Sequence, residues 1–224
     1  MIKQTLWVFG DSFSYPYKVK KELSWPELLS KRLNSEIKNY AQPGADNFFI
    51  FKSFLENYSS ISSDDYVVLG WSHPSRKSFI FDKNNILHKK AIEESIVLNG
   101  LSSLYFRGKP PTTQSNSIKK YLILKPIDSG NSFFDDWYSN YYSREQHDVE
   151  LFAFDLAVKT LNKCRNVIFY FSEESTVGLK LDNSLRVLNF IKSNNVQMSP
   201  EEAHFNEEGH KLWSNIIFKN LSND

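Results

Sequence analysis

The fold of this chain is indicated first by the segment Thr5-Leu6-Trp7-Val8-Phe9-Gly10-Asp11-Ser12, close to the start of the sequence. Its apolar run is short and continuous and ends at a glycine, which predicts a buried strand over residues 4–10. A serine that follows such a strand beside glycine can be held with its backbone N–H directed at an oxyanion. Gly, Asp and Ser also dominate ordinary turns, so both interpretations stay open at this point.

Strands and helices alternate along the rest of the chain. Apolar runs predict further strands over 37–40, 66–71 and 166–171, with a short fifth strand over 196–198. Helices are expected over 24–33, 46–58, 151–161, 181–192 and 206–221, with Ser24, Asp46 and Asn206 as candidate caps. The sequence therefore predicts an α/β fold, a three-layer α/β/α sandwich with a central, mostly parallel sheet of about five strands.

The pattern is lost between about residues 76 and 145. A structureless loop of that length is unusual in a compact domain, whereas 224 residues suit one globular domain. We expect a single domain over 1–224 with an insertion at about 76–145, which has some helix and forms a cap or partner surface beside Ser12. Its aromatic stretch over 133–142 is compatible with a sugar-stacking platform, a cap lining or internal packing.

Composition excludes several classes of partner. The 27 basic and 26 acidic residues give a net charge of +1, which offers no electrostatic case for nucleic acid or an anionic membrane. No apolar run approaches the ~20 residues of a membrane span, and a strand stands where a secretory signal would be. The single cysteine, Cys164, excludes an intrachain disulfide and a cysteine metal site, and its surroundings predict a buried, inert thiol. We expect a cytoplasmic protein, with virion association or release by lysis as alternatives, no metal and no organic cofactor.

Polar residues stand where several of the predicted strands end. Ser12, Gly44 and Ser72 each follow a predicted strand, and His204 follows the short fifth one. Active residues of parallel sheets collect at the carboxyl ends of the strands. The sequence therefore predicts that these four positions share one rim.

His204 is the candidate base. It stands after Pro200 and before the last predicted helix, so a loop at the sheet edge is expected, where a histidine can take a proton from serine. Glu201 can reach back to the other imidazole nitrogen, and Glu202 is a weaker alternative. A solvated loop in which Asn206 caps the last helix is the competing interpretation.

Three segments together resemble the SGNH, or GDSL-type, hydrolase family. They are Gly10-Asp11-Ser12, the stretch Asn39-Tyr40-Ala41-Gln42-Pro43-Gly44-Ala45, and Glu201-Glu202-Ala203-His204. The resemblance covers both termini and the sheet segments but not residues 76–145, and a phage-encoded member is compatible with the compact form. It implies an SGNH/flavodoxin-like fold, a catalytic triad of Ser12, His204 and Glu201, and an oxyanion hole that includes the N–H groups of Ser12 and Gly44.

The chain departs from the family pattern at two positions. The family's third block is Gly-x-Asn-Asp, whereas this chain has Gly70-Trp71-Ser72-His73, so Ser72, or else His73, would have to replace the oxyanion-binding asparagine. Losing one oxyanion donor can cost a factor of ~10²–10³ in rate. The second departure is Glu201, which stands where the family has aspartate.

The resemblance predicts a serine esterase or acyl hydrolase that works through an acyl-enzyme, with a carbohydrate O-acetyl ester as the favoured substrate. Asp11, His73 and Arg76 are candidate substrate-binding residues, although a turn with a solvated Arg76 is the simpler interpretation of that position. A lipid esterase or thioesterase is a closely related alternative. A catalytically weak or inactive binding module and a sugar O-acyltransferase are the alternatives of other classes, and the partner is a small-molecule or glycan ester with the oligomeric state open.

Overall fold

The structure, a computed structural model of the chain, describes residues 3–73, 76–81, 104–106, 120–124, 132–164, 166–171, 185–199 and 202–222. Internal contacts divide the chain into two compact units. The first comprises residues 1–73 and 148–224, and the second comprises residues 74–147. The limits of the second unit lie within about two residues of the expected insertion.

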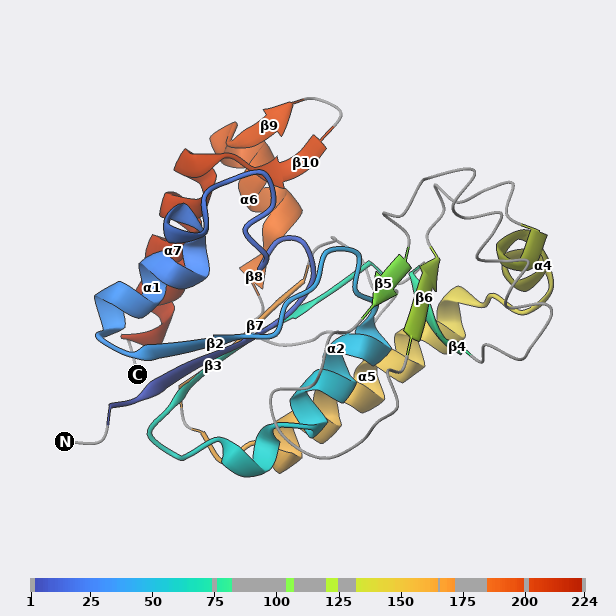
Figure 1. The fold of residues 1–224 in the computed structure, drawn as a ribbon, viewed down its shortest axis with the longest axis horizontal. Helices are drawn as coiled ribbons and strands as arrows, with labels where there is room; N and C mark the ends of the chain where they lie inside the picture. The colour runs from blue at the N-terminus through green and yellow to red at the C-terminus, as the bar shows by residue number, and fades with distance from the viewer. Residues whose placement is uncertain are drawn as a thin grey trace. The chain divides into compact units, whose positions relative to one another are not determined.

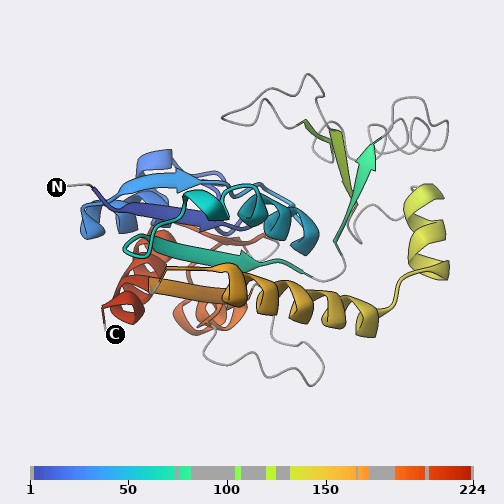
Figure 2. The same cartoon turned by 90° about the horizontal axis from the view of Figure 1, so that it is seen from below.

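The first unit is built on a five-stranded parallel sheet. Its strands lie in the order β2 (Glu36–Asn39), β1 (Thr5–Phe9), β3 (Tyr66–Trp71), β7 (Asn166–Phe171) and β8 (Leu185–Arg186), and each neighbouring pair is parallel. The arrows of β1 and β3 run in the same direction in Figure 2. The predicted α/β fold with a central parallel sheet is confirmed.

Helices cover both faces of this sheet. On one side lie α1 (Trp25–Leu33) and α7 (Glu207–Leu221), and on the other lie α2 (Asn47–Leu55) and α5 (Arg144–Leu161), as Figure 1 shows. A further helix, α6 (Val187–Asn194), packs with α7, and two short 3-10 helices span Lys21–Leu23 (η1) and Tyr58–Ser60 (η2). The three-layer arrangement explains why the inner strands β1 and β3 are apolar and buried, since each must bury both of its faces, whereas the edge strand β2 is polar and mostly exposed.

Side chains of β1 alternate between the two layers. Leu6 and Val8 belong to a core cluster that includes Trp25 of α1 and Trp213 of α7. On the opposite face, Phe9 contacts Phe54 of α2, with ring centroids 5.7 Å apart. Alternation with a period of two therefore divides the β1 side chains between the two helical layers.

The helix starts agree with the sequence at two of three caps. The Asp46 carboxylate accepts the Phe49 N–H at 2.9 Å, and the Asn206 side chain accepts the Gly209 N–H at 2.8 Å. Ser24 precedes α1, but its hydroxyl donates to the Lys21 carbonyl at 2.7 Å and caps nothing.

Two predicted elements at the carboxyl end are present but placed differently, and residues 181–184 lie outside the described residues. Leu185 was assigned to a helix over 181–192, but β8 covers Leu185–Arg186 and α6 begins only at Val187. The segment assigned as the fifth strand forms β9 (Gln197–Ser199), which pairs antiparallel with β10 (Glu202–Phe205) in a separate hairpin. Leu185 pairs with Tyr170, so β8 takes the fifth place in the sheet.

The second unit contains an antiparallel sheet of β4 (Lys77–Phe81), β6 (Lys120–Leu124) and β5 (Leu104–Phe106), together with the helix α4 (Ser132–Asn140). The sequence indicated the helix but not this sheet. Rings near α4 pack on one another: Tyr138 and Tyr142 stack at 4.7 Å and 12°, and Trp137 meets His147 edge-on. Internal packing therefore accounts for part of the aromatic stretch, and the sugar platform stays a prediction. Across the described residues of both units, no helix is long and apolar enough to cross a membrane.

Candidate active site

The turn after β1 presents Ser12. The Asp11 carboxylate accepts the Phe13 N–H at 3.0 Å, and the Asp11 carbonyl accepts the N–H groups of Ser14 and Tyr15. These bonds wind the chain tightly at the carboxyl end of β1. Ser12 is held there with 5% of its surface exposed, so its hydroxyl has a defined position before any substrate binds.

His204 lies beside Ser12. Its Nε2 is 2.8 Å from Ser12 Oγ, although 192 positions separate the two residues in the sequence. His204 stands within β10 and not on a loop, so a β hairpin, fixed by its own hydrogen bonds, carries the imidazole. The distance is short enough for direct proton transfer and lies within the roughly 4 Å expected for such a pair.

Two aromatic rings pack against the imidazole of His204. The centroid of Phe13 lies 5.3 Å away with an interplanar angle of 26°, and that of Tyr17 lies 4.6 Å away with an angle of 34°. The ammonium of Lys18 lies 5.5 Å from the centroid of Tyr17. The segment after the nucleophile thus also positions the base, and nothing in the sequence pattern distinguished Tyr17 for this role.

The acid partner of His204 stays a prediction. Glu201 lies outside the described residues, and of Glu202 only the backbone, in β10, is described. The choice between these two carboxylates therefore belongs to experiment.

Gly44 stands in the loop that connects β2 to α2. Its φ of 77° lies in the left-handed region that glycine adopts without strain. The same loop is tied to the end of β1, because the Gln42 N–H donates to the Gly10 carbonyl at 3.0 Å. The loop is thereby joined to the strand that carries Ser12, and the role of the Gly44 N–H in an oxyanion hole stays a prediction.

Ser72 follows β3 and contacts Asp11. Its hydroxyl donates to Asp11 Oδ2 at 3.0 Å. Asn47, the first residue of α2, holds the backbone of Ser72 on both sides: its Oδ1 accepts the Ser72 N–H at 2.7 Å, and its Nδ2 donates to the Ser72 carbonyl at 3.2 Å. A hydroxyl has one proton to donate, so Ser72 can serve an oxyanion only by giving up Asp11. The sequence did not single out Asn47, whose only signal is its place after the capping Asp46.

The predicted substrate-binding residues fall into three different situations. Asp11 is 1% exposed, and its two carboxylate oxygens accept hydrogen bonds from Phe13 and Ser72. These bonds make Asp11 a support of the turn, and its predicted contact with substrate stays a prediction. His73 directly follows Ser72 and is half-buried, while Arg76 belongs to the second unit, and the substrate contacts of both stay predictions.

A second histidine lies beneath the site. His210 in α7 is buried, and its Nδ1 accepts the N–H of Trp25 at 3.2 Å. Burial lowers its pKa to about 4, and the nearby charge of His204 adds to this effect. A neutral imidazole is consistent with its role as an acceptor in the core.

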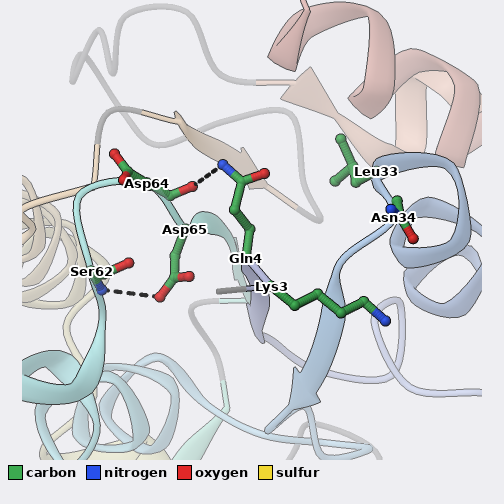
Figure 3. A pocket seen from close by; sticks show the side chains of 7 residues that line it. All are labelled: Lys3, Gln4, Leu33, Asn34, Ser62, Asp64 and Asp65. Atoms are coloured by element: carbon green, nitrogen blue, oxygen red, sulfur yellow. Dashed lines mark hydrogen bonds between the residues drawn. The ribbon is translucent and has the colours of Figure 1, made fainter. Parts of the chain in front are cut away.

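Figure 3 shows a pocket at the other end of the sheet. It has a volume of about 960 Å³ and is lined by Lys3, Gln4, Leu33, Asn34, Ser62, Asp64 and Asp65. The Asp65 carboxylate already accepts the N–H groups of Thr5 and Ser62 and the indole N–H of Trp7. Because this lining contains no histidine to activate its serine, we place the candidate chemistry at Ser12 and not in this cavity.

The five-stranded parallel sheet lies between helices and Ser12 follows its first strand, as the resemblance to the SGNH (GDSL-type) hydrolases implies. Among solved structures, that of TesA supports this likeness of fold. TesA is 11% identical to this chain with a TM-score of 0.51, and the match covers 98% of this chain and 99% of that one. An assigned G-D-S-L family lipolytic protein from Desulfitobacterium hafniense is 12% identical, with a TM-score of 0.46 and coverage of 97% and 99%.

A third similar structure is the esterase EstA from Pseudoalteromonas sp., which is 11% identical with a TM-score of 0.46 and coverage of 98% and 95%. No family model matches the sequence, and no curated protein matches it. At 11% identity the likeness to TesA shows the fold alone, and the activity of this chain has to be argued from its own residues.

Proposed function

We propose that the protein is a serine esterase in which Ser12 is the nucleophile and His204 the base. The observation that supports this function best is the 2.8 Å distance between Ser12 Oγ and His204 Nε2. Serine is a weak nucleophile until a base takes its proton. A turn and a hairpin far apart in the sequence bring these two groups together, and two aromatic rings hold the base in place.

The reaction proceeds through an acyl-enzyme. His204 Nε2 takes the proton of Ser12 as Oγ attacks the ester carbonyl, and a tetrahedral intermediate forms. The protonated imidazole then gives the proton to the leaving alkoxide, which departs as the alcohol. Water attacks the acyl-enzyme with His204 again as base, and the acid is released.

The proposed oxyanion donors are the backbone N–H groups of Ser12 and Gly44, with the hydroxyl of Ser72 as a third. The bond from Ser72 to Asp11 competes with that third role. Because one missing donor costs ~10²–10³ in rate, we expect a slow enzyme unless Ser72 turns toward the substrate.

Glu201 is the proposed acid partner of His204. A carboxylate at Nδ1 would hold the imidazole in the tautomer whose Nε2 accepts from serine, and would stabilise the charged form. Glu201→Gln is expected to lower kcat at least tenfold, with Glu202→Gln as the matched control. Full activity of Glu201→Gln together with loss in Glu202→Gln would assign the role to Glu202.

A carbohydrate O-acetyl ester is the substrate class that we propose to test first. The support for it is the exposed tyrosines near α4, Tyr138 and Tyr141, which are 43% and 68% exposed and could stack on sugars. The experiment is a panel of p-nitrophenyl esters of increasing acyl length, followed by acetylated glycans and a thioester. We expect preference for acetyl, with activity lost in Ser12→Ala and in His204→Ala.

A non-catalytic binding module with the same fold is the second candidate. The hydroxyl of Ser72, which is engaged with Asp11 where the family has a free asparagine amide, favours it. A folded wild-type protein that cleaves no ester in the panel would support this module. Transfer of the acyl group to an added sugar, seen in the products, would instead indicate an acyltransferase.

A further inference from the structure

Ser14 stands two residues after the proposed nucleophile but cannot act on a substrate. It is completely buried, and its hydroxyl is hydrogen-bonded to the hydroxyl of Tyr170. Tyr170 belongs to β7 and is also completely buried. The two hydroxyls form a short contact between the turn after β1 and a strand two places away in the sheet.

The ring of Tyr170 has little freedom to move. A Cβ atom at Gly70 of β3 would lie 2.0 Å from Cζ of Tyr170, so the ring occupies the space that a side chain at position 70 would fill. The indole rings of Trp25 and Trp213 meet it edge-on, with centroids 6.3 Å and 5.7 Å away. The hydroxyl of Tyr170 is therefore a fixed point to which the turn can be attached.

Other contacts hold the backbone of the same turn. The Asn39 amide donates to the Ser14 carbonyl at 2.9 Å, and the Trp25 indole N–H donates to the Phe13 carbonyl at 2.6 Å. The bond to Tyr170 adds a side-chain attachment directly behind Ser12. Burial, helped by the charge of Asp11, raises the pKa of Tyr170 well above its ordinary value, so its hydroxyl keeps its proton at every working pH.

We propose that Tyr170 and Ser14 are a positioning pair that fixes the Ser12 turn at the distance from His204 that catalysis requires. This role rests on the proposed function, because it takes Ser12 as the nucleophile. Neither residue touches the substrate. Since a misplacement of about 1 Å in reacting groups can cost up to ~10²-fold in rate, the loss of this single bond should lower kcat while substrate affinity is kept.

The test is a double-mutant cycle with p-nitrophenyl acetate. Tyr170→Phe keeps the ring and removes the hydroxyl, and Ser14→Ala removes the other partner. Each variant is expected to lower kcat roughly tenfold with KM changed by less than about twofold, and the double variant is expected to be no worse than either single one. Tyr66→Phe is the matched control, because the Tyr66 hydroxyl bonds to Gln4 at the opposite end of the sheet.

A merely structural role would give a different result. Activity would then follow the folded fraction in urea, and kcat per folded molecule, counted by titration with a fluorophosphonate, would stay at the wild-type value. Unchanged kcat in both single variants of an active enzyme would overturn the positioning role and leave the proposed function standing. A wild type that neither cleaves esters nor reacts with the probe would overturn both.

Discussion

Two buried aspartates tie β1 to β3, one at each end of the strands, and they do so with different partners. At the amino ends, Asp65 accepts the N–H groups of Thr5 and Ser62 and the indole N–H of Trp7, at 2.8 to 3.0 Å. At the carboxyl ends, Asp11 accepts the Phe13 N–H and the hydroxyl of Ser72, both at 3.0 Å.

The difference lies in what the partners can do. Burial alone would raise the pKa of Asp65, but the hydrogen bonds from Ser62, Thr5 and Trp7 outweigh it and lower the pKa. All of these donors are fixed, which makes this end an anchor. At the other end one donor is the hydroxyl of Ser72, which can rotate, and its acceptor Asp11 directly precedes Ser12 in the sequence. A buried aspartate that accepts hydrogen bonds thus stabilises the sheet at the Asp65 end and supports the proposed chemistry at the Asp11 end.

The largest expected effect is on stability against pH, since His210 and Asp65 titrate in different ranges. His210, below the site, has a pKa of about 4 in the folded protein and 6.5 when unperturbed. The unfolded chain therefore binds more protons between these values, and stability, complete above pH 6.5, falls as the pH drops toward 4. Asp65 contributes only to a further loss below pH 3.8, because its lowered pKa keeps it ionised above that value.

Urea unfolding at a series of pH values measures this difference. The free energy of unfolding is expected to fall by up to roughly 3 kcal/mol between pH 7 and pH 4, since one pKa unit corresponds to about 1.4 kcal/mol. In His210→Gln the decline over this range should be clearly smaller. A wild type of constant stability down to pH 4.5 would contradict the neutral, buried state of His210.

The next largest effect is a loss of stability expected on substitution of Asp65, the aspartate at the amino ends of β1 and β3. Asp65→Asn turns an amide N–H₂ toward groups that are themselves donors, which should lower the free energy of unfolding by about 2 to 3 kcal/mol. The kcat per folded molecule should stay at the wild-type value. Asp64→Asn is the matched control, because the Asp64 side chain is exposed and should change stability by less than ~0.5 kcal/mol. A lower kcat in folded Asp65→Asn would contradict the conclusion that Asp65 acts on stability alone while Asp11 acts on catalysis.

Asp11 should respond in the opposite way. Asp11→Asn is expected to lower kcat about tenfold and stability by only about 1 kcal/mol, because the turn loosens where the nucleophile stands. Ser72→Ala removes the bond from its other side, so if that bond is what matters, the double variant should be no worse than Asp11→Asn. The test is to measure kcat of the two single variants and the double variant at matched fractions of folded protein. A large loss of stability with unchanged kcat would make Asp11 a second anchor.

The smallest effect is expected at the ring beside the base. Tyr17→Leu removes the aromatic contact with His204 and should lower kcat about threefold, in proportion to a contact of ~0.5–1 kcal/mol. Tyr17→Phe keeps the ring and should match the wild type. Equal losses in both variants would point to the hydroxyl and not to the ring.

Local signals predicted much of this architecture. The strands at β1, β3 and β7 could be predicted because a parallel sheet buries both faces, which leaves uninterrupted apolar runs. The caps Asp46 and Asn206 could be predicted because capping depends on residues three positions apart. The approach of Ser12 and His204 was expected from the motif resemblance and from a fifth parallel strand, but the strand before His204 lies in a separate hairpin, so only the first reason holds.

Longer-range features could not be predicted in this way. Leu185 matched a helical period with Leu188 and Ile191, yet its backbone pairs with Tyr170 at the sheet edge, which only the tertiary fold decides. Tyr170 itself looked like one more apolar strand residue, since its partner Ser14 lies 156 positions away. His204 was expected on a loop because Pro200 favours one, but the β9–β10 hairpin closes around that position.

The most direct test of the central claim is covalent labelling of Ser12 by a fluorophosphonate, located by mass spectrometry of the digested protein. The proximity of His204 Nε2 predicts one adduct per molecule, on the peptide that contains Ser12. Labelling should be lost in Ser12→Ala and strongly reduced in His204→Ala, while both variants remain folded. An adduct that persists in Ser12→Ala, or a folded wild type that takes up no label, would contradict the assignment of Ser12 and His204 as a catalytic pair.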